Sequence, residues 1–173
     1  MTVDYYDWSA YHANVRPNQI AIRDLSANKE LTYSELDIRS NKLAQWLQKN
    51  GLAKGDRVAI LAQNCPEFFE LEFACAKIGA IELPLNWRLT KPELEYILND
   101  STPRVLVYDA AFLDIAIELQ KDCQIKESLQ IDNQDASNQY ESALYGSEGN
   151  YKRVQTNHDD LIMIMYKIGR AHV

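Results

Sequence analysis

The sequence predicts an α/β protein in which a mainly parallel sheet carries helices on both faces. Three observations predict this class. They are a strand–helix–strand unit between residues 55 and 86, apolar runs that alternate with helical patterns after it, and a pair of matching helix-start signals. The chain has 173 residues, of which 46% are hydrophobic and 25% charged, as in ordinary globular domains. We therefore expect one domain with its own hydrophobic core.

The N-terminal residues predict a short helix followed by a β-hairpin. Residues 8–16 combine aromatic and small side chains in a pattern suited to an amphipathic helix, and Pro17 ends it. Residues 20–23 and 29–32 are short strand candidates on either side of the turn-forming residues 26–28.

A longer helix is expected from residue 33 to residue 50, ended by Gly51. Thr32 and Glu35 have the capping-box spacing, in which each side chain accepts a hydrogen bond from the other residue's backbone N–H. The apolar face of this helix consists of Leu36, Leu43 and Leu47. The opposite side chains, which we predict to be exposed to solvent, are Arg39, Lys42, Gln45 and Gln48.

The strand–helix–strand unit is the clearest part of the pattern. Residues 58–62 form an apolar run bounded by turn signals, as expected for a strand buried on both faces. Residues 67–77 show helical spacing of apolar side chains, Gly79 stops the helix, and residues 80–83 form the second strand. A crossover of this length predicts parallel strands, but the unit holds no phosphate-binding glycine pattern and so indicates a scaffold only.

The same alternation continues to residue 132. Thr90 and Glu93 form a second capping box before a helix, strands are expected at residues 105–108 and 128–131, and residues 112–119 form a helix between them. We predict that residues 1–132 form an α/β subdomain. Residues 133–160 are expected to be a polar loop or linker, and residues 161–166 an apolar strand.

Charge and hydropathy exclude several classes of partner. A formal net charge of −7 disfavours nucleic acid, because affinity for a phosphate backbone depends on clustered lysine and arginine. The N-terminus lacks the apolar core of a signal peptide, and no stretch reaches the ~20 apolar residues of a membrane span. We expect a soluble cytoplasmic protein. The sequence has an odd number of cysteines, and we expect all three (Cys65, Cys75 and Cys123) to be free, buried and inert.

The remaining candidate side chains do not converge on a site in the sequence. His12, His158 and His172 lack partners at metal-ligand spacing. We favour a solvated loop end over a cation site for the pair Asp159 and Asp160. Trp87 and Arg88 follow a strand on the ligand-binding edge of such sheets, where they either face a substrate or simply pack and pair. We predict helix-surface and capping roles, not acid–base catalysis, for Glu67, Glu70 and Glu72.

Several short motifs follow one another in order between residues 32 and 100. They are Thr32-Tyr33-x-Glu35-Leu36, Asn41-x-Leu43-Ala44, Gly55-Asp56-Arg57-Val58-Ala59, Asn64-x-Pro66-Glu67, Gly79-Ala80, Pro84-Leu85-Asn86 with Arg88-Leu89, and ELEYILND from Glu93 to Asp100. Together they resemble the N-terminal part of the large domain of the adenylate-forming (AMP-binding) enzymes. The motif at Pro84 is most similar to acyl-CoA synthetases that activate fatty and aryl acids.

This resemblance implies a two-step reaction. A carboxylate attacks the α-phosphate of ATP with Mg²⁺ present, and the thiolate of CoA then displaces AMP from the acyl-adenylate. The implied substrate is a small-molecule fatty or aryl carboxylic acid. The catalytic, cofactor-binding and metal-binding residues of the family lie in later motifs, so the resemblance assigns none of them to a position in this sequence.

Residues 161–166 resemble the family's strand that leads into its Thr/Ser/Gly-rich nucleotide loop, a strand whose neighbours come later in the family's chain. That loop should follow Tyr166, but the sequence continues as Lys-Ile-Gly-Arg-Ala-His-Val. The codons AAG ATC GGA AGA GCA CAC GTC encode these residues and resemble the start of a common sequencing adapter. We therefore predict that residues 167–173 are a non-native tail. The chain is then an inactive N-terminal fragment that binds neither ATP, Mg²⁺ nor CoA tightly. The alternatives are another adenylate former (a peptide-synthetase adenylation domain or a luciferase-like enzyme) or a non-catalytic α/β interaction module.

Overall fold

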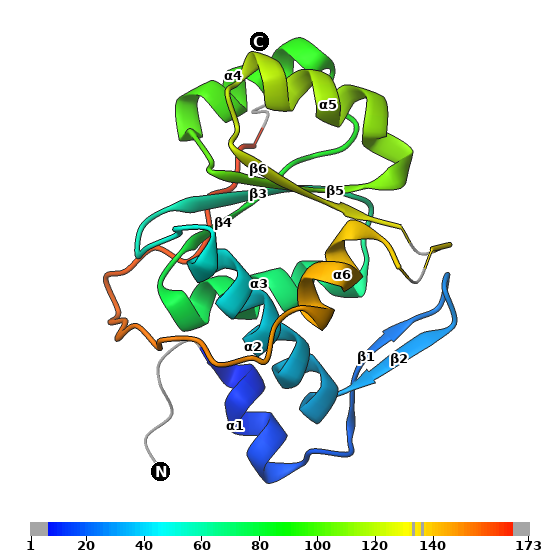
Figure 1. The fold of residues 1–173 in the computed structure, drawn as a ribbon, viewed down its shortest axis with the longest axis vertical. Helices are drawn as coiled ribbons and strands as arrows, with labels where there is room; N and C mark the ends of the chain where they lie inside the picture. The colour runs from blue at the N-terminus through cyan, green and yellow to red at the C-terminus, as the bar shows by residue number, and fades with distance from the viewer. Residues whose placement is uncertain (1–6, 133, 136, 168–173) are drawn as a thin grey trace, which may run out of the picture.

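The structure, a computed structural model, describes residues 7–132, 134–135 and 137–167. Its centre is a four-stranded parallel sheet of order β4-β3-β5-β6 (Figure 1). The strands are β3 (Arg57–Leu61), β4 (Ile81–Pro84), β5 (Val105–Asp109) and β6 (Glu127–Ile131). Helices α4 (Lys91–Ser101) and α5 (Leu113–Asp122) cover one face, and α2 (Tyr33–Lys49), α3 (Pro66–Ile78) and α6 (Gln139–Tyr145) cover the other. The predicted fold class is confirmed.

Burial on both faces explains why the strands read as unbroken apolar runs. Along β3, Val58 and Ile60 pack in the core on the α2 and α3 side, whereas Ala59 and Leu61 pack in the core on the α4 and α5 side. All four side chains have no exposed surface. The alternation follows from the two-residue period of a strand, and it divides the hydrophobic core into two layers.

The N-terminal elements also follow the prediction. Helix α1 (Trp8–Val15) precedes an antiparallel hairpin of β1 (Ile20–Asp24) and β2 (Lys29–Thr32). The capping box at the start of α2 is present, with the Thr32 Oγ1 accepting from the Glu35 N–H at 3.2 Å and the Glu35 Oε2 accepting from the Thr32 N–H at 2.8 Å. These two bonds satisfy backbone donors that the first turn of a helix leaves without intrahelical partners.

Residues 133–160 differ from the predicted loop or linker, because they contain α6. This helix places Tyr140 (1% exposed) and Leu144 (3% exposed) in the core beside α2. Beyond α6, a return segment (residues 146–160) runs back across the helices toward the β4 edge of the sheet, drawn orange to red in Figure 1. The presence of α6 corrects the prediction that residues 133–160 are only a loop or linker. The domain boundary expected at residue 132 stays a prediction.

The return segment covers the face of α2 that we predicted to be exposed. Gln45 accepts a hydrogen bond from the Gly149 N–H at 3.0 Å, and Gln48 both accepts from the Lys152 N–H and donates to the Lys152 carbonyl. The prediction of a solvated face was wrong for these amides. A glutamine amide can form its hydrogen bonds with water or with the backbone of another segment. A polar sequence pattern does not distinguish between these two partners.

An ion-pair network attaches α6 to α2 and α3. The guanidinium of Arg39 donates to Glu70 (Nε–Oε1 2.6 Å) and to both oxygens of Glu141, and the Tyr140 hydroxyl donates to the second oxygen of Glu70 at 2.8 Å. Glu70 and Glu67 are 0% and 1% exposed, so the predicted helix-surface role was wrong for both carboxylates. Both carboxylates are buried because the hairpin and α6, which are distant in sequence, cover this side of α3.

Replacing Tyr140 with phenylalanine is expected to lower the free energy of unfolding by about 2 kcal/mol, because a buried carboxylate loses one of its donors. Urea denaturation measures the change. Tyr145→Phe is the matched control, since Tyr145 lies on the same helix and is 92% exposed. Equal stability of the Tyr140→Phe variant and the unmodified protein would contradict the buried hydrogen bond.

Residues 161–166 were expected to form a strand whose neighbours lie later in the family's chain, but they find a partner within this chain. The Glu82 N–H donates to the Ile162 carbonyl, and the Ile164 N–H donates to the Glu82 carbonyl, both at 2.9 Å. The result is one isolated parallel bridge between Glu82 and Met163 beside the edge strand β4. Residues 168–173 of the predicted tail lie outside the described residues. In the described part of the chain, no helix is long and apolar enough to cross a lipid bilayer.

Candidate functional site

The carboxyl edge of the sheet is where open α/β folds bind ligands, at the point where the strand order reverses. Here β3 leads to β4 on one side, and the chain then crosses to β5 on the other side of β3. Asn64 after β3 and Asp109 at the end of β5 line a small polar cavity of about 260 Å³ together with Asp24 and Ser26 of the hairpin. This cavity adjoins a larger one.

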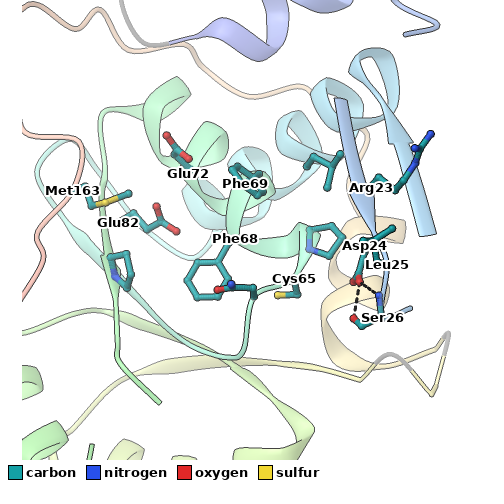
Figure 2. Close-up of a pocket in the computed structure, with 14 residues that line it drawn as sticks. Arg23, Asp24, Leu25, Ser26, Cys65, Phe68, Phe69, Glu72, Glu82 and Met163 are labelled. Atoms are coloured by element: carbon teal, nitrogen blue, oxygen red, sulfur yellow. Dashed lines mark hydrogen bonds between the residues drawn. The ribbon is translucent and has the colours of Figure 1, made fainter. Parts of the chain in front are cut away.

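The larger cavity, which we call the hairpin pocket, has a volume of about 620 Å³. It lies between the β1–β2 hairpin, the first turns of α3, strand β4 and Met163 (Figure 2). Its apolar walls are formed by Ile22, Leu25, Pro66, Phe68, Phe69, Pro84 and Met163. The volume lies in the range of small-molecule sites, and a mostly apolar wall with a few polar groups is typical of them.

Glu82 brings a carboxyl group into this apolar pocket. In the parallel register Glu82 is paired with Val58, so its side chain lies on the α3 side of the sheet. The residue is 1% exposed, and its Oε1 has no hydrogen-bond partner among the described residues. Burial, with a smaller contribution from Glu72, raises the pKa of Glu82 to about 8. The group is therefore neutral at pH 7.

Glu72 is the second acidic group of the pocket. Burial raises the pKa of this carboxyl, which points toward the cavity from α3 (Figure 2). Arg23 is the cation among the lining residues, and its Nε donates to Glu30 at 2.5 Å. A phosphate site needs convergent donors and positive charge, which this set of side chains does not provide. The described residues at this edge therefore do not fit ATP.

Trp87 and Arg88 lie at the carboxyl end of β4, as the sequence predicted. The Trp87 ring packs on Phe112, with centroids 6.3 Å apart, and the Arg88 guanidinium lies 4.1 Å from the centroid of the Trp87 ring. This geometry agrees with the packing-and-pairing interpretation. A substrate-side role for the two residues stays a prediction.

The predicted histidine and aspartate candidates do not come together. His12 packs on Tyr33 and accepts a hydrogen bond from the Arg16 Nε at 3.1 Å. Asp160 forms an ion pair with Lys54 at 2.6 Å, which agrees with the loop-end interpretation of this pair of acidic residues. His158 is exposed, and His172 lies outside the described residues. Within the described ranges, no group of three or more histidine, cysteine or acidic side chains has a metal-binding arrangement.

The cysteines are free, but only one of them is fully buried. Cys75 packs in the core, whereas Cys65 and Cys123 are half-buried, which corrects the expectation that all are buried. Burial raises the pKa of each thiol. The thiolate is the nucleophilic form, so a raised pKa agrees with the predicted inertness.

Glu82 is the site residue that the sequence reasoning missed. Its signal was present, because an acidic residue stands between Ile81 and Leu83 in a strand predicted to be buried. Charged residues are rarely buried without a partner. An acidic residue inside such a run therefore deserves a functional hypothesis of its own.

The comparison with family models covers nearly the whole described chain. The profile of the family "AMP-binding enzyme" matches residues 9–166. The chain is 41% identical over 104 residues to a fatty acid–[acyl-carrier-protein] ligase of Streptomyces coeruleorubidus, a match that covers 60% of this chain and 20% of that protein. It is 42% identical over 101 residues to a feruloyl-CoA synthase of Amycolatopsis sp, which covers 58% of this chain and 20% of the relative.

A solved structure agrees with these sequence matches. A fatty acyl CoA synthetase of Mycobacterium tuberculosis superposes with a TM-score of 0.82 and 29% identity, over 92% of this chain and 31% of that one. The chain thus spans about a fifth of the length of the curated relatives named above. Sequence, fold and the order of motifs agree, and the chain belongs to the AMP-binding enzyme family.

Proposed function

We propose that this chain is the N-terminal scaffold of an ATP-dependent acid–CoA ligase that activates a fatty or aryl carboxylic acid. In that reaction the acid and ATP form an acyl-adenylate and pyrophosphate, and the CoA thiolate then releases AMP. The observation that carries the proposal is the family match over residues 9–166, combined with relatives named as a fatty acid–[acyl-carrier-protein] ligase and a feruloyl-CoA synthase. ATP, Mg²⁺ and CoA are cofactors of the longer enzyme.

The described residues supply the sheet and its two helical layers, but they do not supply a nucleotide site. ATP carries several negative charges, while this chain has a formal net charge of −7 and the carboxyl groups of Glu72 and Glu82 line the hairpin pocket. Electrostatic stabilisation of a reacting phosphate requires preorganised donors. We therefore propose that the 173-residue chain by itself forms no acyl-adenylate.

A pyrophosphate-release assay tests this inactivity. The chain is incubated with ATP, Mg²⁺ and a panel of fatty and aryl acids, and we expect no acid-dependent release above a control without protein. A complete acid–CoA ligase assayed in parallel shows that the acids and conditions are suitable. Acid-dependent release by the chain itself would contradict the proposed inactivity while supporting the ligase assignment.

The genomic sequence after the codon for Tyr166 separates the ligase from the alternatives. A Thr/Ser/Gly-rich loop encoded there supports the ligase proposal, and it also identifies the last residues as foreign. A stop codon after genuine codons for residues 167–173 instead supports the non-catalytic interaction module. The motif between Pro84 and Leu89 favours an acid–CoA ligase over a peptide-synthetase adenylation domain.

A further inference from the structure

The hairpin pocket contains a buried polar atom that its own protein does not satisfy. Glu82 is 1% exposed, and its Oε1 has no hydrogen-bond partner among the described residues. Leaving such an atom unpaired lowers the stability of the folded protein, so its presence in an apolar cavity of about 620 Å³ needs an explanation. The simplest explanation is a ligand that donates a hydrogen bond to it.

The surroundings of Glu82 select the chemistry of that donor. Glu72 of α3 lines the hairpin pocket together with Glu82, and the rings of Phe68 and Phe69 line the same pocket (Figure 2). Once they are ionised, two carboxyl groups attract a cation and repel an anion, and aromatic rings add to the attraction of an ammonium group. The apolar walls leave room for a hydrocarbon or aryl body.

We propose that the hairpin pocket binds a primary amine with an apolar body, whose ammonium group donates hydrogen bonds to Glu82 and Glu72. The opposite assignment, a carboxylate ligand, is disfavoured once Glu82 and Glu72 are ionised, because like charges repel. Arg23 does not offset them, because its guanidinium is paired with Glu30. The proposal concerns a ligand other than the nucleotide, and it does not depend on the proposed function.

Binding should be coupled to protonation. Among the described residues, the titratable groups near Glu82 are Glu72 and Cys75 of α3 and Cys65 before it, with Arg23 and Asp24 on the hairpin side of the pocket. The paired residues 162–164 are uncharged. The pKa of Glu82 is about 8, so an ammonium ion that binds at neutral pH displaces a proton from it. Amine affinity is therefore expected to rise with pH until about pH 8 and to fall once the amine loses its own proton near pH ~10.

Isothermal titration calorimetry of the full chain with three probes of one shape tests the site. The probes are 2-phenylethylamine, 2-phenylethanol and 3-phenylpropionate, each titrated at about pH 8, where Glu82 is half ionised. We expect the amine to bind roughly tenfold or more tightly than the alcohol, and the acid to give no binding. Repeating the amine titration in buffers of different ionisation enthalpy at neutral pH should reveal proton release.

Variants identify the groups responsible. Glu82→Gln keeps the shape of the side chain and should weaken amine binding by roughly tenfold or more, while alcohol binding stays unchanged. Glu127→Gln is the matched control, because Glu127 is exposed on β6. Circular dichroism verifies folding, and Glu72→Gln serves as the second variant if Glu82→Gln unfolds. Equal affinity for amine and alcohol, absence of amine binding, or an unchanged affinity in the folded variants would each overturn the proposal.

Discussion

Replacement of Lys77 by methionine is expected to lower the free energy of unfolding by about 3–5 kcal/mol, because it leaves buried carboxylates without their main counter-charge. The side chain of Lys77 is 0% exposed. Its Nζ donates to both oxygens of Asp7 at 2.8 and 3.0 Å and to Asp37 at 2.7 Å. Burial alone raises the pKa of Asp7, but the charge and hydrogen bond of Lys77 and a smaller effect of Arg153 hold it below its usual value.

Urea denaturation at neutral pH measures the loss, and methionine keeps nearly the same side-chain volume, so a cavity contributes little. Lys126→Met is the matched control, since Lys126 is exposed and lies outside the helices. A second variant, Lys77→Met combined with Asp37→Asn, should recover part of the stability because it removes one of the two carboxylates that have lost Lys77. A Lys77→Met protein as stable as the control would show that the cluster is not buried in solution.

Glu82 is expected to make the protein less stable as the pH rises. The pKa of Glu82 is about 8 in the folded chain against a reference value of 4.5. Between pH 4.5 and about pH 8, the folded state therefore keeps a proton on Glu82 that the unfolded state has lost. The contribution of Glu82 to the free energy of unfolding is greatest below about pH 4.5, falls between pH 4.5 and about pH 8, and is constant above that. The difference corresponds to at most ~5 kcal/mol.

The measurement is a comparison of two proteins across pH, because other groups titrate as well. Urea unfolding of the unmodified chain and of Glu82→Gln at about pH 5, 7 and 9 gives the difference in stability at each pH. The advantage of the glutamine variant should grow by several kcal/mol from the lowest to the highest pH. Parallel stability curves would mean that water or a cation reaches Glu82 in the folded protein.

Local signals in the sequence were sufficient for most of the secondary structure. The capping boxes at Thr32 and Thr90 are read from residues three positions apart, and both form as predicted. Gly79 ends α3 in the left-handed conformation with φ +71°, as a helix-terminating glycine should. Each of these features depends on contacts between near neighbours, so no knowledge of the tertiary structure was needed.

The buried charges could not be predicted in this way, because their partners are distant in sequence. Arg39 and Glu141 look like solvated helix residues until α6 packs on α2, 102 positions apart along the chain. The hairpin pocket likewise requires Arg23, Phe68 and Met163 to meet from three separate segments. What the sequence did provide was the odd acidic residue at position 82 inside an apolar run.

The return segment also bears on the order in which the molecule folds. Its hydrogen bonds to α2 join residues 104 apart, and the contact between Arg153 and Asp7 spans 146 positions. Contacts this distant form late, because the chain between them must be ordered first. The hairpin and the strand–helix–strand unit can therefore assemble while the Lys77 cluster is still open to water. In the folded protein the same segment can detach in a local opening that hydrates Asp7 and Lys77 and leaves the sheet intact.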